Sequence, residues 1–188
     1  EYIEEKTAFP YSMIDNIVPG ASPIVQSYLK ECGFADTEYI KAGHSTYALF
    51  VNAAPQEYLV IEATFPNGRP PLEKAGVIFT DRETVNQCER MKVGTCLNPL
   101  HTALAVYGCL LGYVKISDEI RDPQLKGLIE KIGYDEGLPV VVNPGVLNPK
   151  AFIDELLEQR LPNPNVPDTP QRIATDTSQK VGVRYGIT

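Results

Sequence analysis

The longest apolar stretch of the sequence, residues 95–116, constrains the fold more than any other feature. A transmembrane helix needs roughly 20 apolar residues, and this stretch is long enough to be considered one. Asn98, Pro99 and His101 interrupt its first third, which leaves a clean apolar run of about 14 residues over positions 103–116. A run of that length is typical of a helix buried in a protein core, so we expect a central core helix and no membrane span.

Composition supports one globular domain. The chain has 188 residues, of which 43% are hydrophobic and 22% charged, and this is enough apolar material for a sizeable core. The formal net charge of −7 offers no positive field for nucleic acid or for an anionic membrane surface. We therefore expect neither as a partner, while the oligomeric state stays open.

The cysteines and histidines do not form a metal motif. The four cysteines contain no Cys-x-x-Cys pair, and the chain has only two histidines. A zinc site needs three or four grouped ligands, so we expect no metal. We also expect four reduced thiols and a cytoplasmic protein, because a chain of this size does not need disulfides and its first residues do not resemble a signal peptide.

Capping residues and apolar periodicity predict a mainly helical fold. Helix starts are marked by residues such as Asp81, and by cap–proline pairs at Asp122-Pro123 and Asn148-Pro149. We expect a β-hairpin that joins residues 47–51 to residues 58–61. Helices are expected over about residues 22–33, 81–91, 98–114, 122–133, 148–157 and 169–180. The fold class is thus mainly α with a small antiparallel β-hairpin or sheet.

Lys92, Asn98 and His101 form the most suggestive group of chemical side chains. A buried lysine loses its proton more readily than an exposed one and can accept a hydroxyl proton near neutral pH. A carboxamide and an imidazole nearby could orient the reacting oxygen. A structural interpretation of the same residues is an exposed lysine, a helix cap and a core histidine. The residue types alone leave both interpretations open.

Four sequence blocks, taken in their order along the chain, are more specific than the group of Lys92, Asn98 and His101 alone. They are FPYSMIDNIVP at residues 9–19, FPNGRP at residues 65–70, MKVGTCLNPLHTALA at residues 91–105 and RIATDTSQK at residues 172–180. Together they resemble the polyol-specific long-chain dehydrogenase family, which includes mannitol 2-dehydrogenases and fructuronate reductases. The resemblance implies the C-terminal helical domain of a long-chain dehydrogenase, similar to the C-terminal domain of 6-phosphogluconate dehydrogenase.

The resemblance also implies roles for individual residues. Lys92 would be the general base, Asn98 would hydrogen-bond the reacting oxygen, and His101 would orient the substrate and the lysine. Asp15 would line the substrate site. Two further substrate-binding residues, Arg172 and Lys180, would bind hydroxyl groups or a carboxylate of the substrate. A purely structural role for Arg172 would be a helix ion pair with Asp176.

The lysine motif departs from the family pattern by one extra residue between Lys92 and Asn98. Nine positions separate Lys92 from His101, and at 100° per residue an unbroken α-helix would place them on opposite sides. One residue fewer would place them on nearly the same side. We therefore predict a break or bulge between Lys92 and Asn98, with Lys92 and His101 facing a common cleft. The family patterns also differ at Asn16 and between Asn98 and His101.

The chain lacks a dinucleotide-binding turn. None of its fourteen glycines forms a Gly-x-Gly-x-x-Gly pattern, which an NAD site needs beside the pyrophosphate. We therefore expect residues 1–188 to be the substrate domain of a longer enzyme, with NAD bound mainly by an upstream domain and the fragment alone inactive. NAD or NADP remains open.

The favoured reaction is the interconversion of D-mannonate and D-fructuronate. Mannitol 2-dehydrogenase, which interconverts mannitol and fructose, is the alternative within the family. An alternative of another class is a non-catalytic helical module that binds sugar or a protein, and this alternative predicts an exposed Lys92.

Overall fold

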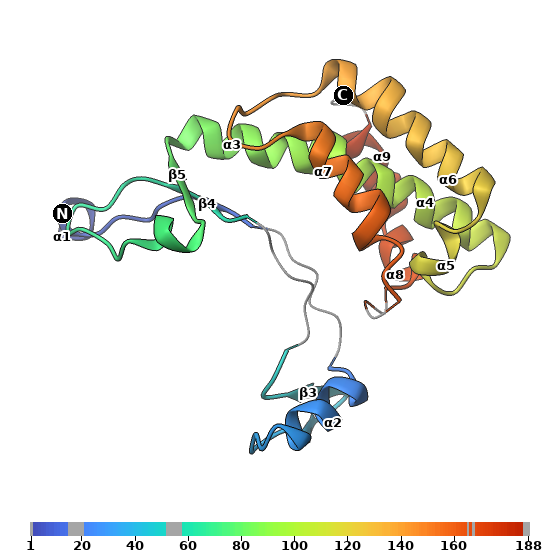
Figure 1. Ribbon diagram of the computed structural model, residues 1–188, viewed down its shortest axis with the longest axis horizontal. Coiled ribbons are helices and arrows are strands. Elements are labelled where there is room, and N and C mark those ends of the chain that lie inside the picture. Colours follow the sequence, from blue (N-terminus) through green and yellow to red (C-terminus); the bar gives the residue numbers. More distant parts are fainter. Residues whose placement is uncertain (1, 15–20, 52–57, 165, 167, 186–188) are drawn as a thin grey trace. The chain divides into compact units, whose positions relative to one another are not determined.

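The computed structural model describes residues 2–14, 21–51, 58–164, 166 and 168–185 (Figure 1). The chain divides into two compact units. One comprises residues 1–14 and 57–188, and the other comprises residues 15–56. Among the described residues, no helix has the length and apolar character needed to cross a membrane.

The smaller unit combines one helix with a hairpin. Helix α2 (Pro23–Glu31) precedes strands β2 (Tyr39–Ala42) and β3 (Ser45–Ala48), which pair antiparallel. Gly43 has a φ of 61° and stands first in the two-residue turn between the strands, where a type II′ turn requires a positive φ.

The predicted hairpin between residues 47–51 and 58–61 is wrong. Tyr47 pairs with Ile40 of β2, whereas Val60 belongs to a different sheet in the larger unit. The segment expected to join the two strands lies outside the described residues. Strand-forming composition identified both segments, but a local pattern does not say which strand each one pairs with.

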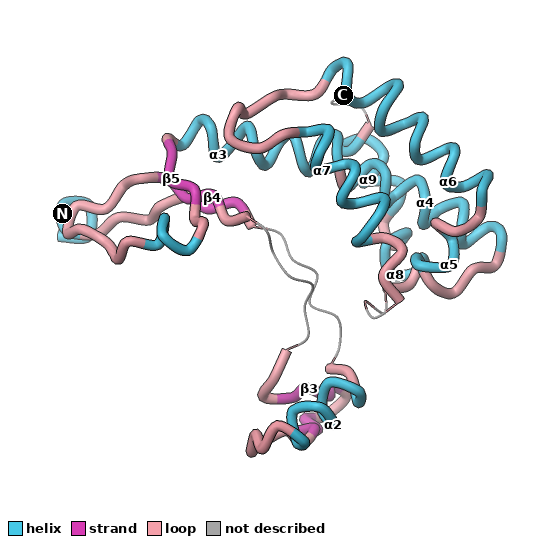
Figure 2. The backbone as a smooth tube through the Cα atoms, in the orientation of Figure 1, coloured by secondary structure: helices cyan, strands magenta, loops and turns pink. Residues whose placement is uncertain are grey.

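The sheet of the larger unit has three short strands in the order β1-β4-β5. Strand β4 (Val60–Glu62) pairs antiparallel with β1 (Ser12–Met13) and parallel with β5 (Ile78–Thr80). Figure 2 shows these strands as short segments among loops. Met13 and Val60 form a small core with Val85 and Cys88 of the helix that follows.

The predicted helix starts are largely confirmed. Asp81 accepts a hydrogen bond from the Thr84 backbone N–H at the start of α3 (Arg82–Arg90), and Asp122 and Asn148 cap two later helices in the same way. Those helices are α6 (Pro123–Glu130) and α7 (Pro149–Glu155). The other α- and 3₁₀-helices are α1 (Tyr2–Lys6), η1 (Leu72–Ala75), α4 (Asn98–Leu111), α5 (Ile116–Glu119), η4 (Leu138–Val140), α8 (Pro170–Ala174) and α9 (Thr177–Arg184).

Three α-helices continue into π-helical turns, and of these the sequence analysis predicted only the bulge between Lys92 and Asn98. They are η2 (Met91–Cys96) after α3, η3 (Lys131–Gly137) after α6, and η5 (Leu156–Arg160) after α7. The predicted helix end at Gly133 is therefore wrong. Gly133 is buried, and a Cβ atom there would lie 3.2 Å from Leu100 Cδ1, so its glycine serves close packing and does not end the helix.

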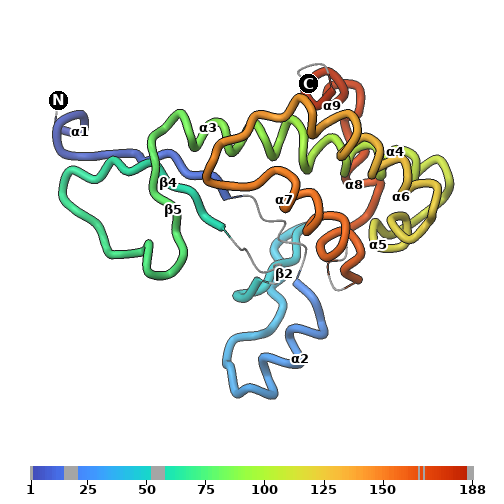
Figure 3. The backbone as a smooth tube through the Cα atoms, turned by 45° about the horizontal axis from the view of Figure 1, so that its top comes forward, coloured from blue at the N-terminus to red at the C-terminus, as the bar shows by residue number. Residues whose placement is uncertain are grey.

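The expected final helix over residues 169–180 is two helices. Asp176 separates α8 from α9 and has a φ of 57°, a left-handed conformation that no α-helix continues through. Figure 3 follows the backbone through this turn. The break is not signalled by glycine or proline, and Asp is one of the few other residues that adopts this conformation.

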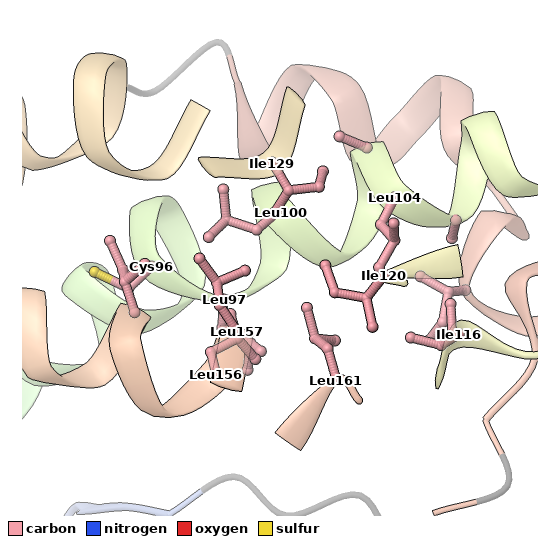
Figure 4. Packing of buried hydrophobic residues seen from close by; sticks show 14 of the residues in the cluster. Cys96, Leu97, Leu100, Leu104, Ile116, Ile120, Ile129, Leu156, Leu157 and Leu161 are labelled. Atoms are coloured by element: carbon pink, nitrogen blue, oxygen red, sulfur yellow. The ribbon is translucent and has the colours of Figure 1, made fainter. Parts of the chain in front are cut away.

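The main hydrophobic core surrounds α4, which packs against α5, α6, α8 and α9. Figure 4 shows Leu97, Leu100 and Leu104 among side chains from the surrounding helices. The predicted buried helix is thus confirmed at the centre of the larger unit. Its partners in the core include Ile116, Ile120, Leu125, Ile129, Phe152, Ile153, Leu156, Leu157, Leu161 and Ile173.

Candidate active site

The backbone bulges between Lys92 and His101. The Leu97 N–H donates to the Lys92 carbonyl at 2.9 Å, an i to i−5 bond, and the His101 N–H returns to the α pattern by donating to the Leu97 carbonyl at 2.9 Å. A π turn absorbs one extra residue, so the nine-residue separation acts as eight and the two side chains differ by about 80° instead of 180°. The predicted discontinuity is confirmed.

The helix start at this discontinuity differs slightly from the prediction. Asn98 is the first residue of α4 and not its cap, which is Leu97, and Pro99 is the second residue. A proline in the first turn lacks only an N–H that would have no helical partner. Asn98 is half-buried at this helix end, with Lys92 and His101 both buried on either side of it in sequence.

Lys92 is buried, with 1% of its surface exposed. Burial, and to a smaller extent the positive charge of Arg160, lowers the pKa of Lys92 to about 7. A lysine in this state is largely neutral just above pH 7 and has a lone pair for accepting a proton. The interpretation of Lys92 as an exposed lysine is therefore wrong.

His101 is paired with Asp168, which the sequence analysis missed. His101 Nε2 and Asp168 Oδ2 are 3.4 Å apart, and both side chains are buried. Burial lowers the pKa of His101 despite the nearby carboxylate. Burial alone would raise the pKa of Asp168, but contacts with His101 and Arg172 keep it below its usual value. A neutral imidazole beside a charged carboxylate results, and this contact favours the tautomer with hydrogen on Nε2.

Arg172 holds the other oxygen of Asp168. Its Nε and NH2 atoms lie 2.8 and 2.7 Å from Asp168 Oδ1. The expected ion pair with Asp176 is replaced by this one, because Asp168 stands one helical turn before Arg172. The structure thus links Arg172 to His101 through Asp168.

Lys180 and Asp15 are not brought to this cluster by any described contact. Lys180 Nζ donates to the Ile173 carbonyl at 2.9 Å, which fastens α9 to α8. Asp15 lies outside the described residues. Their expected substrate-binding roles stay predictions.

Two further charged residues with buried side-chain atoms were missed as well. Arg160 ends η5, and its NH2 atom is buried without a hydrogen-bond partner among the described residues. Glu119 is fully buried at the end of α5, where burial and then the charge of Asp168 raise its pKa to about 8. Neither residue follows a motif, so only the fold could bring them to the core. Of the missed residues, only Asp168 could have been found from the sequence, because its four-residue spacing from Arg172 indicates an ion pair.

No three histidine, cysteine, aspartate or glutamate side chains are grouped to hold a metal ion within the described part of the chain. Cys96 is not a candidate nucleophile, because burial raises the pKa of its thiol to about 12. Lys92 can perform acid–base chemistry, and His101, Asp168 and Arg172 form an ordered network of their own.

These features define a class of protein, a mainly helical domain built around a buried lysine. Residues 84–187 match the family model for the mannitol dehydrogenase C-terminal domain. The chain belongs to this family, which confirms the resemblance found in the sequence.

Individual relatives agree with that assignment. The chain is 57% identical to D-mannonate oxidoreductase of Thermotoga maritima, over 100% of this chain and 35% of that protein. Its structure is similar to substrate-free D-sorbitol dehydrogenase, with a TM-score of 0.81, 30% identity and coverage of 98% of this chain and 35% of that one.

A second solved structure is Pseudomonas fluorescens mannitol 2-dehydrogenase in a ternary complex with NAD and D-mannitol. The TM-score is 0.71 and the identity 28%, over 97% of this chain and 34% of that one. The expected fold class is confirmed by these two structures. The chain spans about a third of the length of the relatives it matches.

Proposed function

We propose that this chain is the substrate domain of an NAD-dependent oxidoreductase that interconverts D-mannonate and D-fructuronate. The observation that carries the proposal is Lys92, a buried lysine with a pKa of about 7 within the family's motif. The chain is 57% identical to a D-mannonate oxidoreductase, and this identity favours D-mannonate over mannitol as the substrate. Four free thiols, at Cys32, Cys88, Cys96 and Cys109, suit a cytoplasmic protein.

In this proposal Lys92 accepts the proton of the substrate hydroxyl that becomes the carbonyl. A group whose pKa lies near the working pH is suited to this task, because it is unprotonated often enough and still basic enough to take the proton. Asn98 donates a hydrogen bond to the oxygen as negative charge develops on it. When bound, NAD would supply the hydride acceptor for this oxidation.

The residues of this chain fit such a cofactor without holding it alone. A lysine that is neutral near pH 7 matches a reaction in which a hydroxyl proton leaves together with a hydride. The glycine pattern for a pyrophosphate is absent from the sequence, so we place the nucleotide-binding site in another part of a longer protein.

His101 and Arg172 would orient the substrate in this scheme. With Nε2 of His101 directed at Asp168, its Nδ1 can accept a hydrogen bond from a substrate hydroxyl. Arg172 fixes Asp168 and keeps more than half of its side-chain surface exposed, so its remaining N–H groups can reach a carboxylate. We assign Lys180 and Asp15 to the same substrate site.

The alternative of a non-catalytic module is weakened by the burial of Lys92. A module that had kept the motif without its chemistry predicts an exposed lysine, since burying a lysine amine is costly. The observed exposure is 1%. Mannitol 2-dehydrogenase remains the alternative within the family.

A spectrophotometric assay tests the proposal. The full-length protein that carries this chain is mixed with NAD and either D-mannonate or D-mannitol, and NADH formation is followed. We expect turnover of D-mannonate with a higher kcat/KM than for D-mannitol, and no turnover by residues 1–188 alone. A higher kcat/KM for mannitol would move the assignment to mannitol 2-dehydrogenase, and no turnover of either compound would overturn it.

A further inference from the structure

Helix α9 ends on the first turns of α4, a contact to which the proposed reaction gives no role. The two helices pack together, and α9 also packs on the bulge η2 (Figure 1). Arg184, the last residue of α9, donates from NH1 to the hydroxyl of Thr102. The hydroxyl of Tyr185 donates to the Pro99 carbonyl at 2.5 Å. Both acceptors belong to the first five residues of α4.

The two acceptors stand directly after the proposed site residues. Asn98 and His101 are three positions apart, and so are Pro99 and Thr102. Residues three apart lie on one face of an α-helix, and each following residue is turned by 100°. The face of α4 that α9 holds is therefore next to the face that bears the carboxamide and the imidazole.

The rotation of α4 about its axis is not fixed by local structure alone. The π turn at η2 interrupts the regular hydrogen bonding between α3 and α4, so α3 does not hold α4 in one rotation. A cavity of about 290 Å³ adjoins the contact and is lined by Gly94, Thr95, Pro99 and Arg184, among others. Packing is thus incomplete on this side of α4, and hydrogen bonds have to supply what packing does not.

Both donors are suited to a lasting contact. Thr102 is buried, with 1% of its surface exposed, and Tyr185 packs against the main core. A hydrogen bond is stronger in such surroundings than in water. Burial raises the pKa of Tyr185 to about 12, so its hydroxyl keeps the proton that it donates. The guanidinium of Arg184 is charged near neutral pH, and charged donors form the stronger hydrogen bonds.

The same helix is also tied to the network of His101. Lys180 of α9 donates to the Ile173 carbonyl of α8 at 2.9 Å. Helix α8 carries Arg172, which holds Asp168, and Asp168 is paired with His101. Helix α9 therefore contacts both α4 and α8, and the relative position of these two helices decides whether His101 meets the Arg172–Asp168 pair.

We propose that Arg184 and Tyr185 are positioning residues that fix the rotation of α4 and thereby direct Asn98 and His101 to the substrate. The inference rests on the proposed function. A helix with its side chains has a radius of about 5–6 Å, so a rotation of about 10° moves a side-chain end by roughly 1 Å. A displacement of that size costs up to about 10²-fold in rate. Loss of either bond should therefore affect kcat more than KM.

Tyr185→Phe in the full-length enzyme tests the proposal, because it removes a single hydroxyl. We expect kcat for D-mannonate to fall by roughly 10- to 10²-fold, with KM nearly unchanged. Tyr113→Phe is the matched control. Tyr113 also packs against the main core and would lose a hydroxyl bond to Asp122, at 2.9 Å. The control should keep kcat, and the two variants should unfold at similar temperatures.

A double-mutant cycle isolates the other bond. Arg184→Met removes the donor, and Thr102→Val removes the acceptor while keeping the shape of the side chain. Either change should lower kcat by roughly two- to tenfold. The double variant should be no slower than the slower single variant, because the same bond is lost only once. Arg184→Lys, which keeps a donor at this place, should retain most of kcat.

Histidine NMR gives a readout that does not need turnover. The full-length protein is labelled with ¹⁵N-histidine, and the His101 signals are assigned by their loss in His101→Gln. The wild type should show one neutral tautomer, with hydrogen on Nε2 toward Asp168. In Tyr185→Phe and in Arg184→Met the two ring-nitrogen shifts should move toward each other, because the contact with Asp168 loosens and the tautomers mix. Tyr113→Phe should keep the wild-type shifts.

Two results would overturn the proposal. If Tyr185→Phe and Arg184→Met match Tyr113→Phe in kcat and leave the His101 shifts unmoved, the contacts only anchor α9. A rise in KM without a fall in kcat would make them substrate-binding contacts instead. If the wild type oxidised neither D-mannonate nor D-mannitol but the His101 shifts still moved, the proposed function would fail while the positioning of α4 stood.

Discussion

Two helices of the larger unit contain the same irregularity but use it differently. The helix through α3 and α4 bulges at η2, and the helix that begins as α6 bulges at η3. In η2 the bulge buries the polar side chain of Lys92 together with Met91, Thr95 and Cys96. In η3 the buried residues are two glycines.

The charged residues of η3, by contrast, face away from the core. Lys131, Asp135 and Glu136 are exposed. The two buried glycines allow the backbone to approach the first helix, and a Cβ on Gly137 would lie 3.0 Å from Thr95 Cγ2. One bulge thus presents a titratable group to the interior, while the other forms a closely packed wall beside it. A π turn alone does not identify a site, but a π turn that buries a lysine points to one.

Replacing Lys92 gives the largest expected effect, and it tests whether the lysine buried by η2 has a catalytic function. Lys92→Met in the full-length enzyme should lower kcat by roughly 10²–10⁴-fold, because the general base is lost. Lys126→Met, at an exposed position on α6, is the matched control and should leave kcat unchanged. A loss below tenfold for Lys92→Met would remove the lysine from its role.

The packing on the two helices should respond in opposite ways to the same substitution. A Cβ on Gly108 of α4 would lie 1.7 Å from Glu119 Oε1, whereas a Cβ on Gly127 of α6 meets nothing within 4 Å. We expect Gly108→Ala to lower the free energy of unfolding by about 1–3 kcal/mol. Gly127→Ala should raise it by about 0.5–1 kcal/mol. Urea denaturation measures both, and equal effects would show that Glu119 is not packed on α4.

Glu119 should also make stability depend on pH in a defined direction. Its folded pKa of about 8 lies above the ordinary value of 4.5. Between those values the unfolded state releases the proton and the folded state keeps it, so stability from this group falls as pH rises and levels off above pH 8.

Glu119→Gln should remove this fall of the free energy of unfolding with rising pH. Between pH 5 and 7 the free energy of unfolding of the wild type should fall relative to the variant by about 2–3 kcal/mol. Glu136→Gln, on the exposed face of η3, is the control and should keep the wild-type slope. Parallel curves for the wild type and Glu119→Gln would mean that Glu119 is ionised in the folded protein.

Local sequence features predicted the parts of the fold that depend on local interactions. Asp81, Asp122 and Asn148 were recognisable as caps, since capping joins residues two or three apart. The apolar run located α4, because such a run is also a local feature of the sequence. The partner of Tyr47 in the small hairpin was not predictable in this way, because strand pairing depends on segments that are distant in the chain.

The candidate site was predictable only in part. The bulge between Lys92 and Asn98 was predictable because the chain has one residue more there than the family pattern it resembles, and helix geometry requires the extra residue to be absorbed. Arg160, Asp168 and Glu119 come from three different segments, and their burial results from how those segments pack. Residue types and spacing contain no information on which distant charges end near Lys92.

The pH dependence of kcat/KM for D-mannonate oxidation by the full-length wild-type enzyme tests the central claim most directly. If Lys92 is the base, kcat/KM should rise about tenfold per pH unit below pH 7 and level off above it, since the base must be unprotonated. An acid limb with its midpoint near 7 is the predicted result. A profile that stays flat from pH 5 to 9, or that still rises steeply toward pH 10, would contradict the account.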